Sequence, residues 1–270
     1  MQFNQIATSG MVLLGCGKMG SAMLGGWLEQ GLAPECIYVT EPHPSEWLRA
    51  TGVHLNTALP QAPAVALLAV KPQMMGAALP SLQALGNGKT LFISIAAGTS
   101  LARLAETLGT NTPIIRAMPN TPAAVGCGIS ALVGNPQVSL GDMALAESLL
   151  AAVGETVRLE EEAQIDAVTA LSGSGPAYVF HLIEAMAEAG TQLGLAPDLS
   201  MRLARATVIG AGQLAAGSPE TAAQLRENVT SPKGTTEAAL RVLMNADSGL
   251  PPLLRSAITA AHARARELAQ

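Results

Sequence analysis

Three glycines near the start of the chain have the spacing of a dinucleotide-binding turn. Gly15, Gly17 and Gly20 form a G-x-G-x-x-G pattern between an apolar stretch at residues 11–14 and a helical pattern at residues 21–30. The first glycine allows a tight turn, the second lets the backbone approach a pyrophosphate, and the third lets helix and strand pack closely. The helix N-terminus then offers unpaired N–H groups to the phosphates. The pattern predicts a dinucleotide site; the alternative is a glycine-rich turn that binds nothing.

An acidic residue stands where the adenosine ribose of such a cofactor is expected. Glu41 ends a predicted strand, 21 residues after Gly20. A carboxylate at this place accepts hydrogen bonds from ribose hydroxyls and repels a 2′-phosphate, which favours NAD. Thr40, His43 and Arg49 are close by and would serve a phosphate if Glu41 turned away. The cofactor is therefore expected to be NADPH or NADH, with the choice open.

Lysine is scarce, and its placement is informative. Three of the four lysines, Lys18, Lys71 and Lys233, lie in loops that contain glycine or proline. Lysines that serve solubility would be scattered over helix surfaces. The placement favours an anionic ligand at these loops, and chance placement of solvated charges is the alternative.

A second loop, far along the chain, combines hydroxyl groups with a glycine. Ser231, Gly234, Thr235 and Thr236 precede a helix predicted over residues 237–243. A helix N-terminus of this composition suits a carboxylate, although a capped turn explains the local pattern equally well. Ser174, followed by Pro176 in the first turn, is predicted to be the N-cap of another helix, and that structural interpretation is sufficient by itself.

Strands alternate with helices over the first part of the chain. The apolar stretches predicted as strands are residues 11–14, 36–40, 53–55, 64–70, 90–95, 114–118, 129–133 and 155–159. The predicted helices are residues 21–30, 45–50, 74–85, 100–108 and 140–153. This alternation predicts an α/β, Rossmann-type, doubly wound and mostly parallel sheet. Ligands bind at the carboxyl ends of such strands, where Lys71 and the small residues Ala96, Ala97 and Gly98 are expected.

The strand signal stops at residue 160. We therefore expect a dinucleotide-binding domain over residues 1–159 and an all-α domain over residues 160–270. Alanine and glycine dominate the predicted helices, and large side chains are few. We expect this domain to complete its core with a second subunit; the alternative is a monomer whose helices pack on the sheet.

The composition excludes several other classes of protein. A net charge of −5 with no basic cluster argues against nucleic acid or an anionic membrane as partner. The longest apolar run, residues 64–70, is too short for a transmembrane helix, and the N-terminus does not have the pattern of a secretory signal. Cys16, Cys36 and Cys127 show no C-x-x-C spacing, and the four histidines are scattered, so we expect no metal site and a cytoplasmic protein.

Five motifs together resemble one family. They are GCGKMG (residues 15–20), AVKPQ (69–73), RAMPNTP (116–122), LSGSGPAY (171–178) and VTSPKGTT (229–236). Their order and spacing resemble the pyrroline-5-carboxylate reductases over nearly the whole chain; the last two motifs are highly specific, whereas many dehydrogenases share the first. The resemblance implies reduction of 1-pyrroline-5-carboxylate to L-proline with NADPH or NADH, the last step of proline biosynthesis. It also implies a homodimer, which in this family often assembles further into a decameric ring.

The resemblance further implies site residues. Thr236 would be the catalytic residue and would hydrogen-bond the ring nitrogen of the substrate. The implied substrate-binding residues are Ser174, Ser231, Lys233, Gly234, Thr235 and Thr236. The implied cofactor-binding residues are Gly15, Cys16, Gly17, Lys18, Met19, Gly20, Glu41, Asn56, Ala69, Val70, Lys71, Pro72, Ala96, Ala97, Gly98 and Asn228.

Two positions depart from the family pattern. Lys233 stands where the family usually has glycine, and Lys18 stands where it often has asparagine. The side chain of Lys233 would either add charge for the substrate carboxylate or point to solvent.

Two other functions fit parts of the pattern. A reductase of the same two-domain build, acting on a β-hydroxy acid or a prephenate-like substrate, would need a catalytic lysine or histidine in the helical domain, such as Lys233 or His181. A nucleotide-sensing regulatory protein would keep the glycine loop but have no need for the SPKGTT loop.

Overall fold

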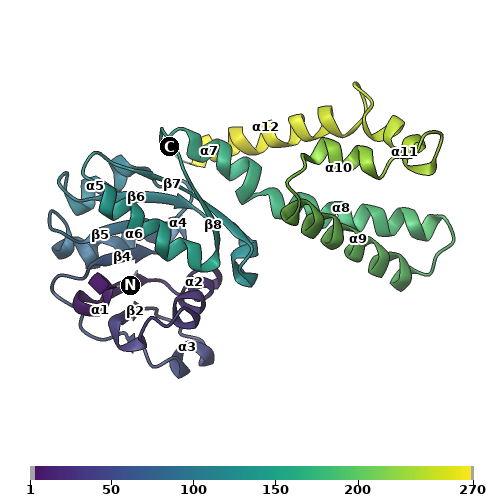
Figure 1. The fold of residues 1–270 in the computed structure, drawn as a ribbon. Helices are drawn as coiled ribbons and strands as arrows, with labels where there is room; N and C mark the ends of the chain where they lie inside the picture. Colours follow the sequence, from purple (N-terminus) through teal and green to yellow (C-terminus); the bar gives the residue numbers. More distant parts are fainter. Residues whose placement is uncertain (1–3, 269–270) are drawn as a thin grey trace. The chain divides into compact units, whose positions relative to one another are not determined.

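Eight strands form one sheet in the computed structural model, which describes residues 4–268 (Figure 1). The strands are β1 (Met11–Leu14), β2 (Ile37–Thr40), β3 (His54–Leu55), β4 (Val65–Leu68), β5 (Leu91–Ser94), β6 (Ile114–Met118), β7 (Gly128–Gly134) and β8 (Gly154–Arg158). Their order is β3-β2-β1-β4-β5-β6-β7-β8. The β6–β7 pair is antiparallel and all other neighbours are parallel, so the predicted doubly wound, mostly parallel sheet is confirmed.

The central strand β1 is buried on both faces. Met11 and Leu13 pack into one apolar cluster with side chains of α2 (Lys18–Glu29) and α6 (Leu140–Leu150). Val12 and Leu14 pack into a second cluster with α4 (Pro72–Ala78) and α5 (Leu101–Leu108). This double burial explains why the strands read as continuous apolar runs without alternation. The strand order reverses at β1, between β2 and β4, and open α/β sheets bind their ligands at such a point.

The remaining elements of the sheet part are short. They are α1 (Asn4–Ser9), α3 (Glu46–Ala50), α7 (Gln164–Val168) and the 3₁₀ helices Pro34–Cys36, Leu79–Leu85, Thr121–Val125 and Ala151–Val153. The predicted helices at residues 74–85 and 140–153 are real but end in these tighter 3₁₀ turns. Helix α2 begins at Lys18, three residues before the predicted start, because Gly17 is its N-cap.

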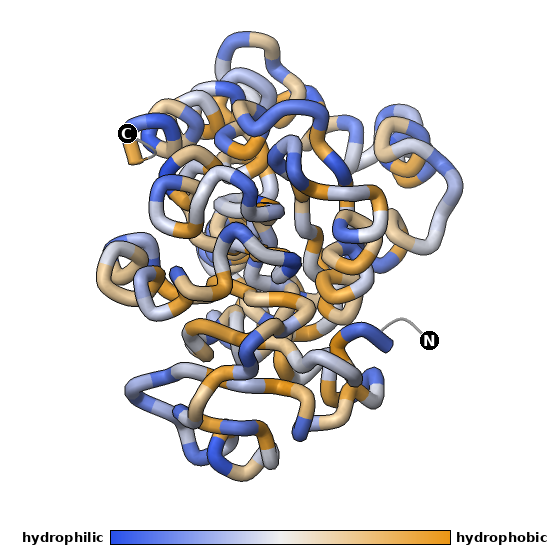
Figure 2. The backbone as a smooth tube through the Cα atoms, turned by 90° about the vertical axis from the view of Figure 1, so that its left-hand side faces the viewer, coloured by the Kyte–Doolittle hydropathy of each residue, from blue (hydrophilic) through white to orange (hydrophobic). Residues whose placement is uncertain are grey.

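The second part of the chain is helical. Its elements are α8 (Gly175–Gln192), α9 (Pro197–Gly217), α10 (Ala222–Asn228), α11 (Thr235–Leu243) and the first half of α12 (Leu250–Leu268). Along the backbone, hydrophobic stretches (orange) alternate with hydrophilic ones (blue) in Figure 2. Among residues 4–268, none of the helices combines the length and the apolar character needed to cross a membrane.

Packing divides the chain at Ser174. Residues up to Ser174, together with the chain end from Ala261, form one compact unit, and Gly175–Ala260 forms the other. Residues 160–174 belong to the first unit because Ile165 and Ala170 are buried in it and Glu162 pairs with Arg116 of β6. The domain division after residue 159 stays a prediction, since a boundary between domains need not coincide with a division by packing.

The loop expected before α8 is not a loop. Residues Thr169–Gly173 form a π-helical turn, in which the Ser174 N–H donates to the Thr169 carbonyl over 2.8 Å. Ser174 itself has helical dihedral angles (φ −85°, ψ −20°). Because an N-cap residue has non-helical angles, the prediction that Ser174 caps α8 is wrong.

Candidate nucleotide and substrate sites

The glycine loop after β1 is built by close backbone contacts. Gly15 has φ +88°, and a Cβ on it would lie 2.8 Å from Val70 Cγ1 and 3.0 Å from the Ala69 backbone. A Cβ on Gly20 would lie 2.7 Å from the Gly15 carbonyl oxygen. Both positions therefore require glycine, and Ala69 and Val70 lie against the loop. Contact of Ala69 and Val70 with the cofactor stays a prediction.

Gly17 differs from the other two glycines, because its surroundings are open. A Cβ on Gly17 would meet nothing within 4 Å, and no side chain caps the helix that starts there. The first N–H groups of α2, which begins with Lys18 and Met19, have no acceptor within the helix. Open space beside uncapped N–H groups at a twelve-residue helix fits a pyrophosphate.

Glu41, after β2, reaches the glycine loop. Its Oε2 accepts the Cys16 N–H at 2.8 Å, and its Oε1 accepts the His43 N–H at 3.0 Å. The structure thus has the carboxylate turned toward the loop. The pKa of the Cys16 thiol is raised, chiefly by burial and also by the Glu41 charge, while a hydrogen bond with Ser21 opposes the rise. This thiol is therefore a neutral part of the loop.

Asn56, after β3, holds the main chain of Glu41. Its Oδ1 accepts the Glu41 N–H at 2.9 Å, and its Nδ2 donates to the Glu41 carbonyl at 2.8 Å. Its φ of +53° is in the left-handed region, which asparagine tolerates better than most residues. Both polar atoms of the Asn56 side chain are thus engaged with Glu41.

The other predicted cofactor residues follow β4 and β5. Lys71 is the N-cap of α4 and Pro72 its first residue. Pro72, Ala97 and Gly98 line a cavity of about 330 Å³, and Ala96 is buried beside it in the chain. The cavity therefore lies at the carboxyl ends of two neighbouring parallel strands, as the rule for open sheets predicts.

The SPKGTT loop forms the start of α11 in the helical unit. Gly234 is the N-cap, with extended backbone angles and no side-chain cap, so the helix starts at Thr235, two residues before the predicted start. A Cβ on Gly234 would lie 2.4 Å from Ser231 Oγ, which places that hydroxyl against the helix start. Thr236 is half-buried and Thr235 exposed. The predicted substrate residues from Ser231 to Thr236 are thus gathered around one uncapped helix N-terminus.

Lys233 and Glu237 fix the shape of this loop. Lys233 has φ +60°, which explains why the family usually has glycine at this position. Its N–H donates to Glu237 Oε2, and Glu237 Oε1 accepts from Arg241 at 3.1 Å. These two interactions lower the pKa of Glu237, the Lys233 N–H most.

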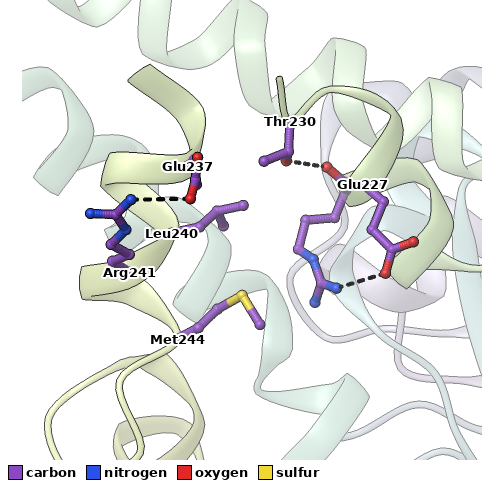
Figure 3. A pocket seen from close by; sticks show the side chains of 7 residues that line it. Glu227, Thr230, Glu237, Leu240, Arg241 and Met244 are labelled. Carbon is purple, nitrogen blue, oxygen red and sulfur yellow. Dashed lines mark hydrogen bonds and ion pairs between the residues drawn. The ribbon is translucent and has the colours of Figure 1, made fainter. Parts of the chain in front are cut away.

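A cavity of about 390 Å³ lies beside Glu237, between α10 and α11. Figure 3 shows Glu237 and Arg241 on one wall and Thr230 and Glu227 on the other. Thr230 Oγ1 donates to the Arg226 carbonyl at 2.6 Å, which ties the end of α10 to the loop. The cavity is lined by Arg226, Glu227, Thr230, Glu237, Leu240, Arg241 and Met244.

Asn228 is the last residue of α10 and belongs to the helical unit. Its Nδ2 donates to Glu220 at 3.0 Å, and its Oδ1 accepts from Gln224 at 3.2 Å. The structure gives the Asn228 amide partners on α10 and the segment before it. Its contact with the cofactor, like that of Ser174 with the substrate, stays a prediction.

Two residues of the RAMPNTP motif have structural roles that the sequence analysis did not assign. Arg116 is 5% exposed and pairs with Glu162 at 2.6 Å, and Glu162 also accepts the Leu101 N–H at 2.8 Å. Asn120 Oδ1 accepts the Ile129 N–H at 2.9 Å, and its Nδ2 donates to the Ser172 carbonyl at 3.3 Å. Asn120 thus links the RAMPNTP and LSGSGPAY motifs. For Arg116, a charged residue in an apolar strand was the available signal.

Among the residues described, no group of three or more His, Cys, Asp or Glu side chains is arranged to hold a metal ion.

The fold and the glycine loop define a nicotinamide-dinucleotide oxidoreductase with an appended helical unit. Residues 11–98 match the family model "NADP oxidoreductase coenzyme F420-dependent", and residues 162–268 match "Pyrroline-5-carboxylate reductase dimerisation". The chain belongs to the pyrroline-5-carboxylate reductase family.

Individual relatives agree with this assignment. The chain is 40% identical to a pyrroline-5-carboxylate reductase of Pseudomonas aeruginosa, over 98% of each chain. A solved pyrroline-5-carboxylate reductase of Coxiella burnetii is 37% identical, with a TM-score of 0.91 over 97% of this chain and 99% of that one. A pyrroline carboxylate reductase of Plasmodium falciparum, solved with NADP bound, is 28% identical, with a TM-score of 0.82 over 97% and 98%.

Proposed function

We propose that the protein is a pyrroline-5-carboxylate reductase, which reduces 1-pyrroline-5-carboxylate to L-proline with NADPH or NADH. The observation that carries the proposal is a pair of helix starts. Both α2 and α11 begin on a glycine with no side-chain cap, and both loops belong to motifs of the family. By contrast, α3, α5, α6 and α10 are capped by Ser45, Ser100, Ser139 and Thr221. Helices α4, α7 and α9 also lack a side-chain cap, but their N-cap residues are Lys71, Ala163 and Ala196. The two starts on glycine, with no Cβ at the N-cap, suit the two anionic groups of this reaction, a pyrophosphate and a carboxylate.

The glycine loop would hold the cofactor. The N–H groups at Lys18 and Met19 receive the pyrophosphate, and Gly17 leaves room for it. The Lys18 side chain is exposed at the same turn and adds positive charge. When bound, the reduced nicotinamide supplies a hydride, and the chain's own contribution is to orient it against the imine.

The SPKGTT loop would hold the imine acid. The N–H groups at the start of α11 and the Ser231 hydroxyl bind the carboxylate, which fixes the five-membered ring. The imine carbon gains a hydride and the ring nitrogen holds a proton. The Thr236 hydroxyl hydrogen-bonds that nitrogen and orients it. A protonated imine is already electrophilic, so positioning and electrostatics suffice as the protein's contribution.

The helical unit would form a homodimer. Helix α8 has 18 residues, of which Ala187 is buried, and α9 buries Ser200 and Ala204. Large side chains on these helices remain exposed, among them Phe180 at 60% and Ile209 at 54%. Apolar helix faces of this extent suit a second copy of the chain. We further propose assembly of the dimers into a decameric ring, a cytoplasmic location and no nucleic-acid partner.

The test is oxidation of NADPH and NADH, followed by absorbance, with and without 1-pyrroline-5-carboxylate. We expect oxidation only with the imine present and proline as the product. Tight binding of nucleotide without turnover would instead favour the regulatory sensor. Reduction of NADP+ or NAD+ by an acyclic hydroxy acid, lost in Lys233→Ala, would favour the related reductases.

A further inference from the structure

We propose that Glu41, braced by Asn56, makes the enzyme select NADH over NADPH. The proposal rests on the proposed function for its substrate and concerns a choice that the family assignment leaves open. It assigns Glu41 a role in specificity and Asn56 the role of a positioning residue.

The Glu41 carboxylate is fixed at the end of β2, where the rule for dinucleotide-binding folds puts the adenosine ribose. Its two oxygens accept one backbone N–H each, from Cys16 in the glycine loop and from His43 beyond β2. The Gly15 N–H also donates to the Thr40 carbonyl at 2.8 Å, which joins the loop to the same strand end. The carboxylate therefore stays beside the loop, and the alternative in which Glu41 turns away would cost it two hydrogen bonds.

Asn56 fixes the main chain of Glu41. Its side chain makes both a donor and an acceptor bond to the Glu41 main chain, and its own N–H donates to the Val39 carbonyl at 2.8 Å. The ends of β1, β2 and β3 are thus linked at one point of the sheet edge. Glu41 has little freedom to withdraw from a ligand at this place.

The negative charge of Glu41 is not neutralised by a neighbour. Among residues 4–268, no lysine, arginine or histidine side chain forms an ion pair with it. Lys18, His43 and Arg49, the cations nearest in sequence, all have exposed side chains. A 2′-phosphate would therefore meet an unpaired carboxylate in a rigid setting.

The same carboxylate suits a ribose diol. Each carboxylate oxygen has a second lone pair beyond the one used by the backbone N–H. Two ribose hydroxyls can donate to these lone pairs, whereas a 2′-phosphate offers acceptors and negative charge. Charge and hydrogen bonding therefore both favour NADH at this site.

The first experiment measures the dissociation constants of NADH and NADPH by fluorescence titration, together with kcat/KM for each cofactor with 1-pyrroline-5-carboxylate. We expect NADH to bind at least about 10-fold more tightly. In Glu41→Gln, which keeps the shape but removes the charge, we expect the preference to fall by about 10-fold. Glu46→Gln, the same charge change on exposed α3, is the matched control and leaves the ratio unchanged.

A second variant separates position from charge. Glycine accepts the φ of +53° at position 56, so Asn56→Gly removes both side-chain bonds without backbone strain. We expect its preference for NADH to lie between those of the wild type and Glu41→Gln, with the Glu41 charge intact.

Two results would overturn the proposal: tighter binding of NADPH by the wild type, or a preference that Glu41→Gln does not change. Failure of the proposed function looks different. In that case neither cofactor is oxidised with the imine, yet the two titrations still decide the role of Glu41.

Discussion

Helices α2 and α11 have the same kind of N-terminus in two different surroundings. Both helices begin on a glycine in extended conformation, Gly17 and Gly234, and neither start is capped by a side chain. The first is held by packing, since Gly15 and Gly20 fit against each other and against Ala69 in a buried sheet. The second lies on an exposed surface and is held by the Glu237 carboxylate. The nucleotide loop thus has close backbone packing in addition to the bond from the Cys16 N–H to Glu41, whereas the substrate loop is held by the bond from the Lys233 N–H to Glu237.

The largest effect is expected at the glycine loop. Gly17→Leu adds a side chain in open space, so we expect at least about 100-fold weaker nucleotide binding with thermal stability nearly unchanged. Gly20→Val forces a clash with the Gly15 carbonyl and should also destabilise the protein by about 1–3 kcal/mol. Nucleotide titration and thermal unfolding measure the two effects. Undiminished binding by Gly17→Leu would contradict the assignment of the loop.

Thr236 tests the chemistry of the second loop. Because its hydroxyl holds the ring nitrogen, Thr236→Ala should lose roughly 10- to 1,000-fold in kcat, or about 1.4–4 kcal/mol. Thr236→Ser keeps the hydroxyl and should recover most of the rate. Steady-state kinetics with the imine decide this, and a full rate in the alanine variant would reject the role.

Glu237 tests what holds that loop. Glu237→Gln weakens the bond to the Lys233 N–H, so we expect KM for the imine to rise about 10-fold with a smaller change in kcat. Glu227→Gln is a matched control, because the Glu227 side chain lines the same cavity but pairs with Arg226 at 3.4 Å (Figure 3). The bond from the Thr230 N–H to the Glu227 carbonyl, 2.9 Å long, is kept in this variant.

The pH dependence provides a second readout of the same bond. The folded-state pKa of Glu237 is lowered, so the stabilisation is present above the ordinary glutamate pKa and is lost as pH falls through the lowered value. The wild-type KM should therefore rise in acid toward that of Glu237→Gln. If the variant's KM rises in acid as steeply as the wild type's, another group is responsible.

The smallest effect is expected at Lys233. Its left-handed backbone favours glycine, so Lys233→Gly should leave stability unchanged or raise it by up to about 1 kcal/mol. Urea unfolding measures this change. A higher KM in the same variant, with stability intact, would show that the lysine charge serves the substrate carboxylate.

Much of the fold was readable from local pattern. Apolar runs predicted the strands to within a residue or two. The signal is clearest for β1, β4 and β5, in which every residue is buried. The π-helical turn at Thr169–Gly173 was missed because Ser and Gly are typical of loops. A helix continued through them here because Ile165 and Ala170 pack into the sheet unit.

For the candidate site too, part of the arrangement follows from the sequence and part only from the tertiary structure. The sequence by itself determined the glycine spacing, the SPKGTT loop and the family, since these depend on residue type and order along the chain. Only the tertiary structure decided that Glu41 reaches Cys16, that Asn56 is bound to Glu41 and that Arg116 pairs with Glu162. These contacts join residues up to 46 positions apart. Their partners are set by strand order and packing, which no local pattern encodes.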